Sequence, residues 1–157
     1  MLKTFVITAA VVLLGAAPMA QDAKRAGTTA LPTVTVYRTP TCGCCGKWVQ
    51  HLQAAGFTVS DHIVQTLNKA QGRERVPEQL RSCHTAHVGR YVVEGHIPAD
   101  VVKDLVRKRP NVEGIAVPGM PAGSPGMESP YPVAYEVIAF DKKGTRSTFA
   151  RITPPAR

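Results

Sequence analysis

Residues 39–48 read TPTCGCCGKW, so three of the four cysteines in the chain lie within four positions. Immediately before this segment, residues 34–37 (VTVY) are β-branched and aromatic, which favours a strand. After it, apolar side chains recur at helical spacing from Trp48 to Ala55. The cysteines are therefore predicted to lie in a loop between a strand and the N-terminus of a helix.

A helix N-terminus favours thiolate over thiol, because its free N–H groups and its dipole stabilise negative charge. Cys42 and Cys45 form a C-x-x-C pair, a spacing that lets two sulfurs alternate between dithiol and disulfide. Cys44 adds a third thiol to the same loop, and three thiols cannot all be paired locally. One of them is therefore free, bonded to Cys83 or bound to a metal.

The chain has 157 residues and is 44% hydrophobic, which indicates one compact domain. The predicted order is strand, helix, strand, weak helix, hairpin and helix. These elements are expected at about 33–37, 46–55, 57–63, 65–81, 82–88 with 91–94, and 99–109. This order predicts an α/β fold with a thioredoxin-like core over residues 33–110.

Residues 111–157 are expected to belong to the same domain. Positions 114–127 are too rich in glycine and proline to predict regular structure there, and such long loops are often functional. Residues 135–140 and 145–152, on either side of a turn, predict a C-terminal hairpin that extends the sheet or flanks it.

The N-terminus has the layout of a secretory signal, with Lys3 followed by an apolar run over residues 4–17. The run is shorter than the roughly 20 residues that cross a bilayer. We therefore predict a signal peptide over residues 1–20, a flexible leader over 21–32, no mature transmembrane segment and a periplasmic location. An uncleaved anchor remains an alternative, because Pro18 stands where a cleavage site prefers a small residue. Outside the cytosol, disulfides are the default state of cysteines.

The formal net charge is +8 at pH 7. Basic residues are spread over several segments, and they cluster only between Lys103 and Arg109, at a predicted helix C-terminus where cations suit the dipole. An exported protein with this distribution is not expected to bind nucleic acid.

Sulfur and imidazole side chains converging on one loop suit Cu(I), a soft ion that accepts low coordination numbers. Zinc would instead require a closed tetrahedron, and thioethers are ligands of copper rather than zinc. The predicted ligands are Cys42, Cys44, Cys45, Cys83, His84, Met120 and Met127.

Structural roles compete with these assignments. The four cysteines allow two disulfides, Cys42–Cys45 with Cys44–Cys83. Met120 and Met127 are alternatively gap-filling residues under a long loop. Trp48 is expected in the core. Packing or surface positions are expected for His51, His62 and His87, whereas His84 and His96 are left open between ligand and structural roles.

Four motifs then resemble a known family when taken in order: TPTCGCCGKW at 39–48, SCHTA at 82–86, VEGHIPA at 93–99 and AVPGMPAGSPGME at 116–128. Residues 33–149 resemble the CopG-like family of exported bacterial proteins, long described as a domain of unknown function and associated with copper resistance. Residues 63–75, within and just before the second predicted helix, are the least family-like part, with Gln65 and Thr66 where the family is expected to have an acidic pair.

The resemblance implies a thioredoxin-like periplasmic protein that binds one or more copper ions and has a redox role toward copper. It points to the C-x-C-C cluster and the Cys83–His84 pair as ligands, and Met120 and Met127 match its loop motif. The expected partners are copper ions and a periplasmic copper chaperone, exporter or oxidase. Two alternatives remain: an enzyme exchanging protein disulfides through Cys42 and Cys45, and a disulfide-stapled binding module without a redox cycle.

Overall fold

The computed structural model describes residues 30–154. The predicted signal peptide, residues 1–20, and all but the last three residues of the predicted leader lie outside the described residues.

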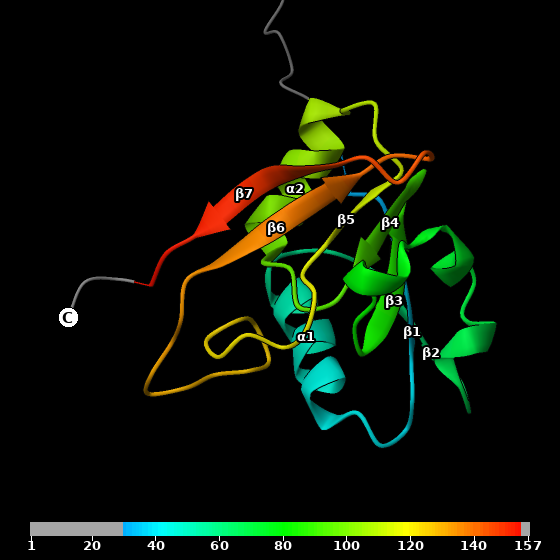
Figure 1. Cartoon of the computed structure of the whole chain (residues 1–157). Helices are drawn as coiled ribbons and strands as arrows, with labels where there is room; N and C mark the ends of the chain where they lie inside the picture. The colour runs from blue at the N-terminus through cyan, green and yellow to red at the C-terminus, as the bar shows by residue number, and fades with distance from the viewer. Residues whose placement is uncertain (1–29, 155–157) are drawn as a thin grey trace, which may run out of the picture.

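The fold is a mixed α/β arrangement of one seven-stranded sheet and two helices (Figure 1). The strand order in the sheet is β2-β1-β3-β4-β5-β6-β7. The elements are β1 (Val34–Arg38), α1 (Gly43–Ala54), β2 (Val59–Ile63), β3 (His84–Val88), β4 (Tyr91–Glu94), α2 (Ala99–Lys108), β5 (Gly114–Ala116), β6 (Tyr135–Phe140) and β7 (Arg146–Ile152).

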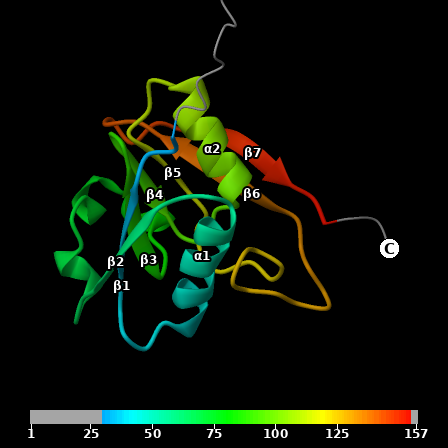
Figure 2. The same cartoon turned by 180° about the vertical axis from the view of Figure 1, so that it is seen from behind.

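Two strand pairs are parallel, β1 with β2 and β4 with β5, and the other neighbours are antiparallel. Parallel neighbours need a crossover connection, which α1 and α2 supply. Both helices lie on the same face of the sheet (Figures 1 and 2).

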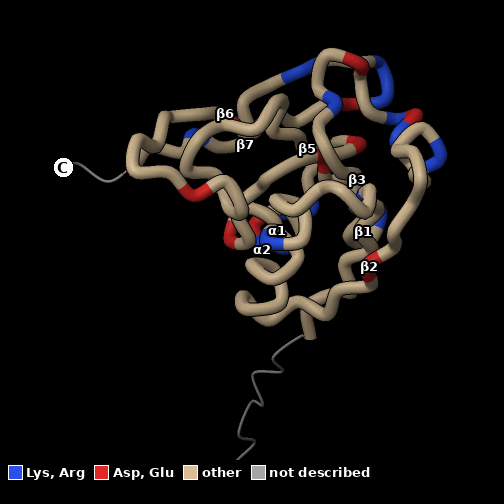
Figure 3. Tube along the Cα trace, turned by 90° about the horizontal axis from the view of Figure 1, so that it is seen from below, with Lys and Arg blue, Asp and Glu red and all other residues tan. Residues whose placement is uncertain are grey.

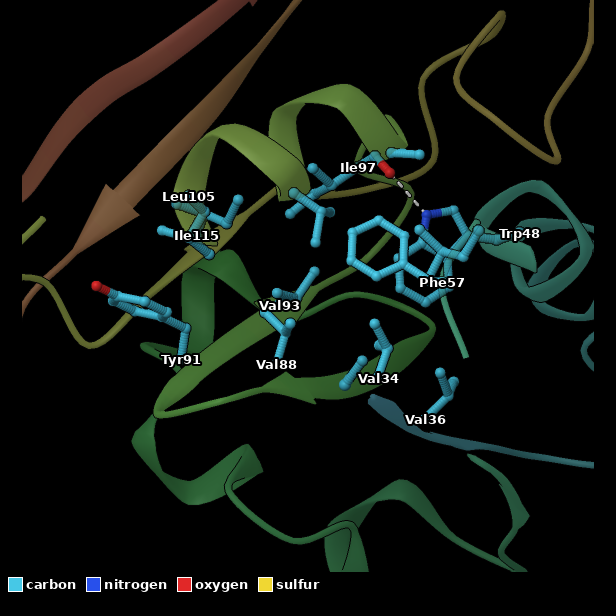
Figure 4. Close-up of a cluster of buried hydrophobic side chains, with 14 of the residues drawn as sticks. Val34, Val36, Trp48, Phe57, Val88, Tyr91, Val93, Ile97, Leu105 and Ile115 are labelled. Carbon is cyan, nitrogen blue, oxygen red and sulfur yellow. Dashed lines mark hydrogen bonds between the residues drawn. The ribbon is translucent and has the colours of Figure 1, made fainter. Parts of the chain in front are cut away.

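The larger core cluster fills the space between this face and the helices (Figure 4). Trp48 on α1 is fully buried there, and its indole nitrogen donates a 2.8 Å hydrogen bond to the carbonyl oxygen of Ile97. The expectation that Trp48 is a core residue is confirmed. Because side chains alternate along a strand, Val93 on β4 packs toward the helices while Val92 packs on the opposite face.

That opposite face is covered by three short 3-10 turns, η1 (Leu67–Lys69), η2 (Arg73–Arg75) and η3 (Glu78–Leu80). The weak helix predicted over 65–81 is therefore wrong. Gly72 has a left-handed φ of 77°, and a side chain there would meet the His87 ring. Pro77 interrupts the segment again, so each turn ends before an α-helix can form.

The prediction of an irregular loop over residues 114–127 is wrong for its first three residues, because Gly114–Ala116 forms β5. A Cβ at Gly114 would collide with the backbone of Val92 and approach the Phe140 ring, so glycine permits this close strand pairing. β5 joins β4 to β6, and the C-terminal hairpin therefore extends the sheet.

Leu105 is fully buried on α2, and truncating it tests this packing. We expect Leu105→Ala to lower the free energy of unfolding by about 2–5 kcal/mol, since a buried cavity replaces the side chain. Urea denaturation measures the loss. The control is Arg107→Ala on the exposed side of the same helix, which removes a surface ion pair worth about 0.5 kcal/mol. Equal losses for the two variants would contradict the assigned helix face.

Basic residues occupy several segments of the described chain and have acidic residues among them (Figure 3). Between residues 30 and 154, no helix is long and apolar enough to cross a membrane.

Candidate metal centre

All segments that carry predicted ligands meet at one end of the sheet. β1 ends there and leads to the cysteine loop, while β3 begins there directly after Cys83. β4 and β5 also end at this edge and lead to His96 and to the Gly/Pro loop. The strand directions therefore bring together residues that lie far apart in the sequence.

The cysteine loop runs directly into α1, which begins at Gly43, three residues before the predicted start. Cys42 is the N-cap residue, and Cys44 and Cys45 lie in the first turn. Cys45 is buried, whereas Cys42 and Cys44 are partly buried. All three sulfurs are thus placed at the positive end of the helix dipole.

Cys42 and Cys45 are joined by a disulfide, with Cα atoms 5.4 Å apart. Cys44 and Cys83 are free, so the second bridge of the two-disulfide alternative is not formed. The Cys44 sulfur lies 3.5 Å from that of Cys42. The loop therefore combines a closed C-x-x-C pair with an adjacent free thiol.

Cys83 joins the cysteine cluster to a pair of histidines. Ligand atoms of Cys42, Cys44, Cys45 and Cys83 all lie within 4.8 Å of one another. A second group with the same spacing contains Cys45, Cys83, His84 and His96. Burial raises the pKa of the Cys83 thiol to about 11, and the nearby Cys44 adds to this shift.

His84 is fully buried at the start of β3. Its Nδ1 lies 3.5 Å from the Cys83 sulfur, and its ring centroid lies 4.3 Å from that of Trp48. Burial lowers the pKa of His84 to about 3, so the imidazole is neutral at neutral pH, which is the form that binds metals. Its Nε2 is buried without a hydrogen-bond partner among the described residues.

His96 makes the closest polar contact to Cys83, with Nε2 3.0 Å from the sulfur. Its Nδ1 lies 2.8 Å from the Pro125 carbonyl oxygen, and because a carbonyl can only accept, this nitrogen carries the proton. Nε2 therefore presents its lone pair to the sulfur. The sequence alone did not decide whether His96 is a ligand or a structural residue. Its position two residues after the end of β4, near the start of β3, was the feature that could have indicated a place beside Cys83.

The Gly/Pro loop packs against this centre. The Gly119 carbonyl accepts a 2.7 Å hydrogen bond from the Ser82 hydroxyl, beside Cys83. Met120 is 50% exposed and Met127 is partly buried on the same loop. Their roles as ligands stay predictions.

The other three histidines make contacts outside the two groups. His51 Nε2 accepts a hydrogen bond from the Ala99 backbone N–H at the start of α2. His62 stacks on Tyr37, and His87 contacts the Gln71 carbonyl. The expectation of packing or surface roles for these three residues is confirmed.

Gly126 fixes the distance between the loop and the cysteines. It has a φ of 87°, and a Cβ there would lie 2.6 Å from the Cys44 carbonyl oxygen and 3.1 Å from the Trp48 nitrogen. We expect Gly126→Ala to push the loop away and to raise the rate at which an alkylating reagent modifies Cys44 and Cys83. The control is Gly144→Ala, which has a similar φ of 81° but no neighbour within 4 Å. If both variants are modified at the parental rate, the loop does not shield the thiols.

The fold and this centre define a class: a mixed α/β protein with a partly buried cluster of cysteines and histidines that could hold a metal ion. A family model described as "Protein of unknown function, DUF411" matches residues 80–127. The comparison with curated proteins found no match.

Two solved structures are similar to most of the chain. Copper resistance protein CopG, form 1, is 40% identical, with 79% of this chain and 99% of that chain covered and a TM-score of 0.73. Form 2 is 41% identical, with 78% and 98% covered and a TM-score of 0.72. The chain belongs to the CopG-like copper-resistance family.

Proposed function

We propose that this protein binds Cu(I) in copper homeostasis or resistance. The proposed ligands are the four thiolates and the imidazole of His84, with Met120 and Met127 as further sulfur donors. The observation that carries the proposal is the convergence of four cysteine sulfurs within 4.8 Å at one end of the sheet. The unpartnered Nε2 of buried His84 also supports a ligand at this site, because buried polar atoms are rarely left unsatisfied.

The donor set favours copper over zinc. Thiolates bind both Cu(I) and zinc, whereas the thioether sulfurs of Met120 and Met127 are soft donors that suit Cu(I) and not zinc. The two overlapping groups of potential ligands share Cys45 and Cys83, so together they would offer donors for more than one ion. The family relationship to proteins named for copper resistance points to the same metal.

The closed Cys42–Cys45 bond supports a link between copper binding and electron transfer. When the two thiols form the disulfide they release two electrons and two protons, and the electrons reduce two Cu(II) ions to Cu(I). In the reverse direction, two Cu(I) ions would be oxidised to Cu(II), and their two electrons together with two protons would open the disulfide to two thiols. The same sulfurs would thus bind Cu(I) and exchange electrons with copper.

We further infer a thioredoxin-like core over residues 33–110 and an extension over 111–157 within the same domain. The support is the order β2-β1-β3-β4, in which a strand-helix-strand unit precedes an antiparallel hairpin and a helix. We also propose export to the periplasm by residues 1–20 and a chaperone, exporter or oxidase as the copper partner.

A second candidate is a thiol–disulfide oxidoreductase that acts on protein disulfides. It is favoured by a disulfide at a helix N-terminus in which Cys42 is partly exposed and Cys45 is buried. In that role Cys44 would be a liability, because a third thiol 3.5 Å from Cys42 competes for mixed disulfides.

The Cys44→Ser variant separates the two functions. We expect it to keep a reversible Cys42–Cys45 disulfide and to bind Cu(I) at least about tenfold more weakly, because one thiolate is lost. Competition with a coloured Cu(I) chelator measures the affinity. Gly43→Ala is the matched control in the same turn, since a Cβ there meets nothing within 4 Å. Parental Cu(I) affinity in Cys44→Ser would refute the cluster.

A further inference from the structure

Cys83 lies just outside the sheet, directly before β3, so ladder hydrogen bonds do not hold the residue that precedes it. Two side chains hold Ser82 instead. The Ser82 N–H donates a 2.7 Å hydrogen bond to the Glu94 carboxylate. The Ser82 carbonyl accepts a 3.2 Å hydrogen bond from Nη2 of Arg73. Both backbone polar groups of Ser82 are therefore fixed by one ion pair.

The pair itself is buried and tightly connected. The Glu94 side chain is 0% exposed and that of Arg73 is 13% exposed, with 2.7 Å between Nη1 and Oε1. Thr85, on the other side of the Cys83–His84 dipeptide, donates to Oε2 of Glu94 at 2.7 Å and accepts from Arg73 at 3.2 Å. The pair thus anchors the chain on both sides of the dipeptide.

We propose that Arg73 and Glu94 are positioning residues for the metal centre, fixing the backbone around Cys83 so that its sulfur stays against the imidazoles of His96 and His84. Neither residue reaches the thiol directly. Alternation along β3 and β4 places Thr85 and Glu94 on the face covered by η2, while His84 packs with Trp48 on the helix face. The Arg73–Glu94 pair therefore acts on the metal centre through the backbone, from the opposite face of the sheet.

A second ion pair on the same turn provides the contrast. Arg75 binds Glu113 at 2.5 Å, with side-chain exposures of 36% and 8%. Its side chain also forms a 3.2 Å hydrogen bond with His87, and neither side-chain contact involves the Ser82–Cys83 segment. Substituting Arg75 thus perturbs an ion pair on η2 without touching the chain that carries Cys83.

The first readout is independent of copper. In a Cys44→Ser background with the Cys42–Cys45 disulfide closed, Cys83 is the single free thiol of the chain. We expect Arg73→Lys to raise the alkylation rate of Cys83 by roughly tenfold. This corresponds to a decrease of about 1.4 kcal/mol in the free energy of local opening around Cys83. Lysine keeps the charge but lacks the planar fork that binds a carboxylate and a carbonyl together. Arg75→Lys should keep the parental rate.

The second readout, Cu(I) affinity in the background with all four cysteines, rests on the proposed function. There Arg73→Lys should weaken binding by about 10- to 100-fold, the usual cost of losing a residue that orients a ligand, and Arg75→Lys should leave it unchanged. Glu94→Gln, which keeps the shape of the side chain, provides a second variant if Arg73→Lys does not fold. Equal behaviour of the Arg73 and Arg75 variants in the alkylation assay would overturn the positioning role. Failure of the parent to bind Cu(I) would overturn the proposed function alone.

Discussion

Replacing Cys83 with serine is expected to weaken Cu(I) binding by about 100-fold or more, since losing a direct ligand should exceed the 10- to 100-fold cost of losing an outer-shell partner. Cys83 belongs to both groups of potential ligands, so its loss removes a sulfur from each. It also removes the 3.0 Å contact between the Cys83 sulfur and Nε2 of His96. A competitive titration with a Cu(I) chelator measures this change.

Two controls accompany this variant. Cys83→Ser changes one partly buried atom, so its free energy of unfolding should stay within about 1 kcal/mol of the parent's value. His62→Asn removes an imidazole on β2 that is stacked on Tyr37, away from both ligand groups, and should bind Cu(I) as the parent does. Parental affinity in folded Cys83→Ser would show that copper does not bind between the cysteine loop and β3.

The oxidised protein is expected to bind Cu(I) about 100-fold or more weakly than the reduced protein, because closing the Cys42–Cys45 disulfide removes two thiolates. Cys44, Cys83, His84 and His96 would remain as weaker donors. Parallel anaerobic titrations of the two redox forms test this difference. Equal affinities would mean that Cys42 and Cys45 are not ligands and would favour the stapled binding module.

Binding of Cu(I) must in turn favour the reduced form of the Cys42–Cys45 pair, because copper binding and disulfide reduction are thermodynamically linked. A 100-fold preference of Cu(I) for the dithiol form corresponds to a rise of about 59 mV in the reduction potential of the Cys42–Cys45 couple. Voltammetry of the protein with and without Cu(I) measures the shift. An unchanged potential would separate copper binding from the disulfide and would count against coupled electron transfer.

The sequence predicted the parts of the fold that local periodicity governs. The strand-like segments 82–88 and 91–94, separated by the two residues Gly89 and Arg90, predicted the β3–β4 hairpin, and the apolar stripe from Val101 to Val106 predicted α2. Both elements have caps or turns encoded within a few residues. Their existence and type could therefore be argued without knowledge of the rest of the chain.

Two elements depended on tertiary contacts that periodicity does not reveal. β5 is three residues long and begins at Gly114, where glycine reads as a loop signal but permits close contact with Val92. The 65–81 segment carries enough apolar residues to suggest a helix. Val76 and Leu80 instead bury against Val92 and Phe140 through short turns.

The candidate site was only partly visible in the sequence. The C-x-C-C spacing singled out Cys42, Cys44 and Cys45 at once, and Cys83 was the only remaining cysteine. His96 could not be distinguished from a structural histidine, because its approach to Cys83 depends on the shared edge at which β3 begins and β4 ends. The roles of Arg73 and Glu94 depend on the same three-dimensional arrangement.

The proposed function depends on binding of Cu(I) by the reduced cysteine cluster. The most direct test is an anaerobic Cu(I) titration of the fully reduced protein against a coloured competing chelator, with bound metal and free thiols counted on the same sample. We expect the protein to take one or more copper ions from the chelator and its thiols to become protected in proportion. Failure to compete, with all four thiols still reactive and a readily reversible Cys42–Cys45 disulfide, would contradict it and favour the oxidoreductase.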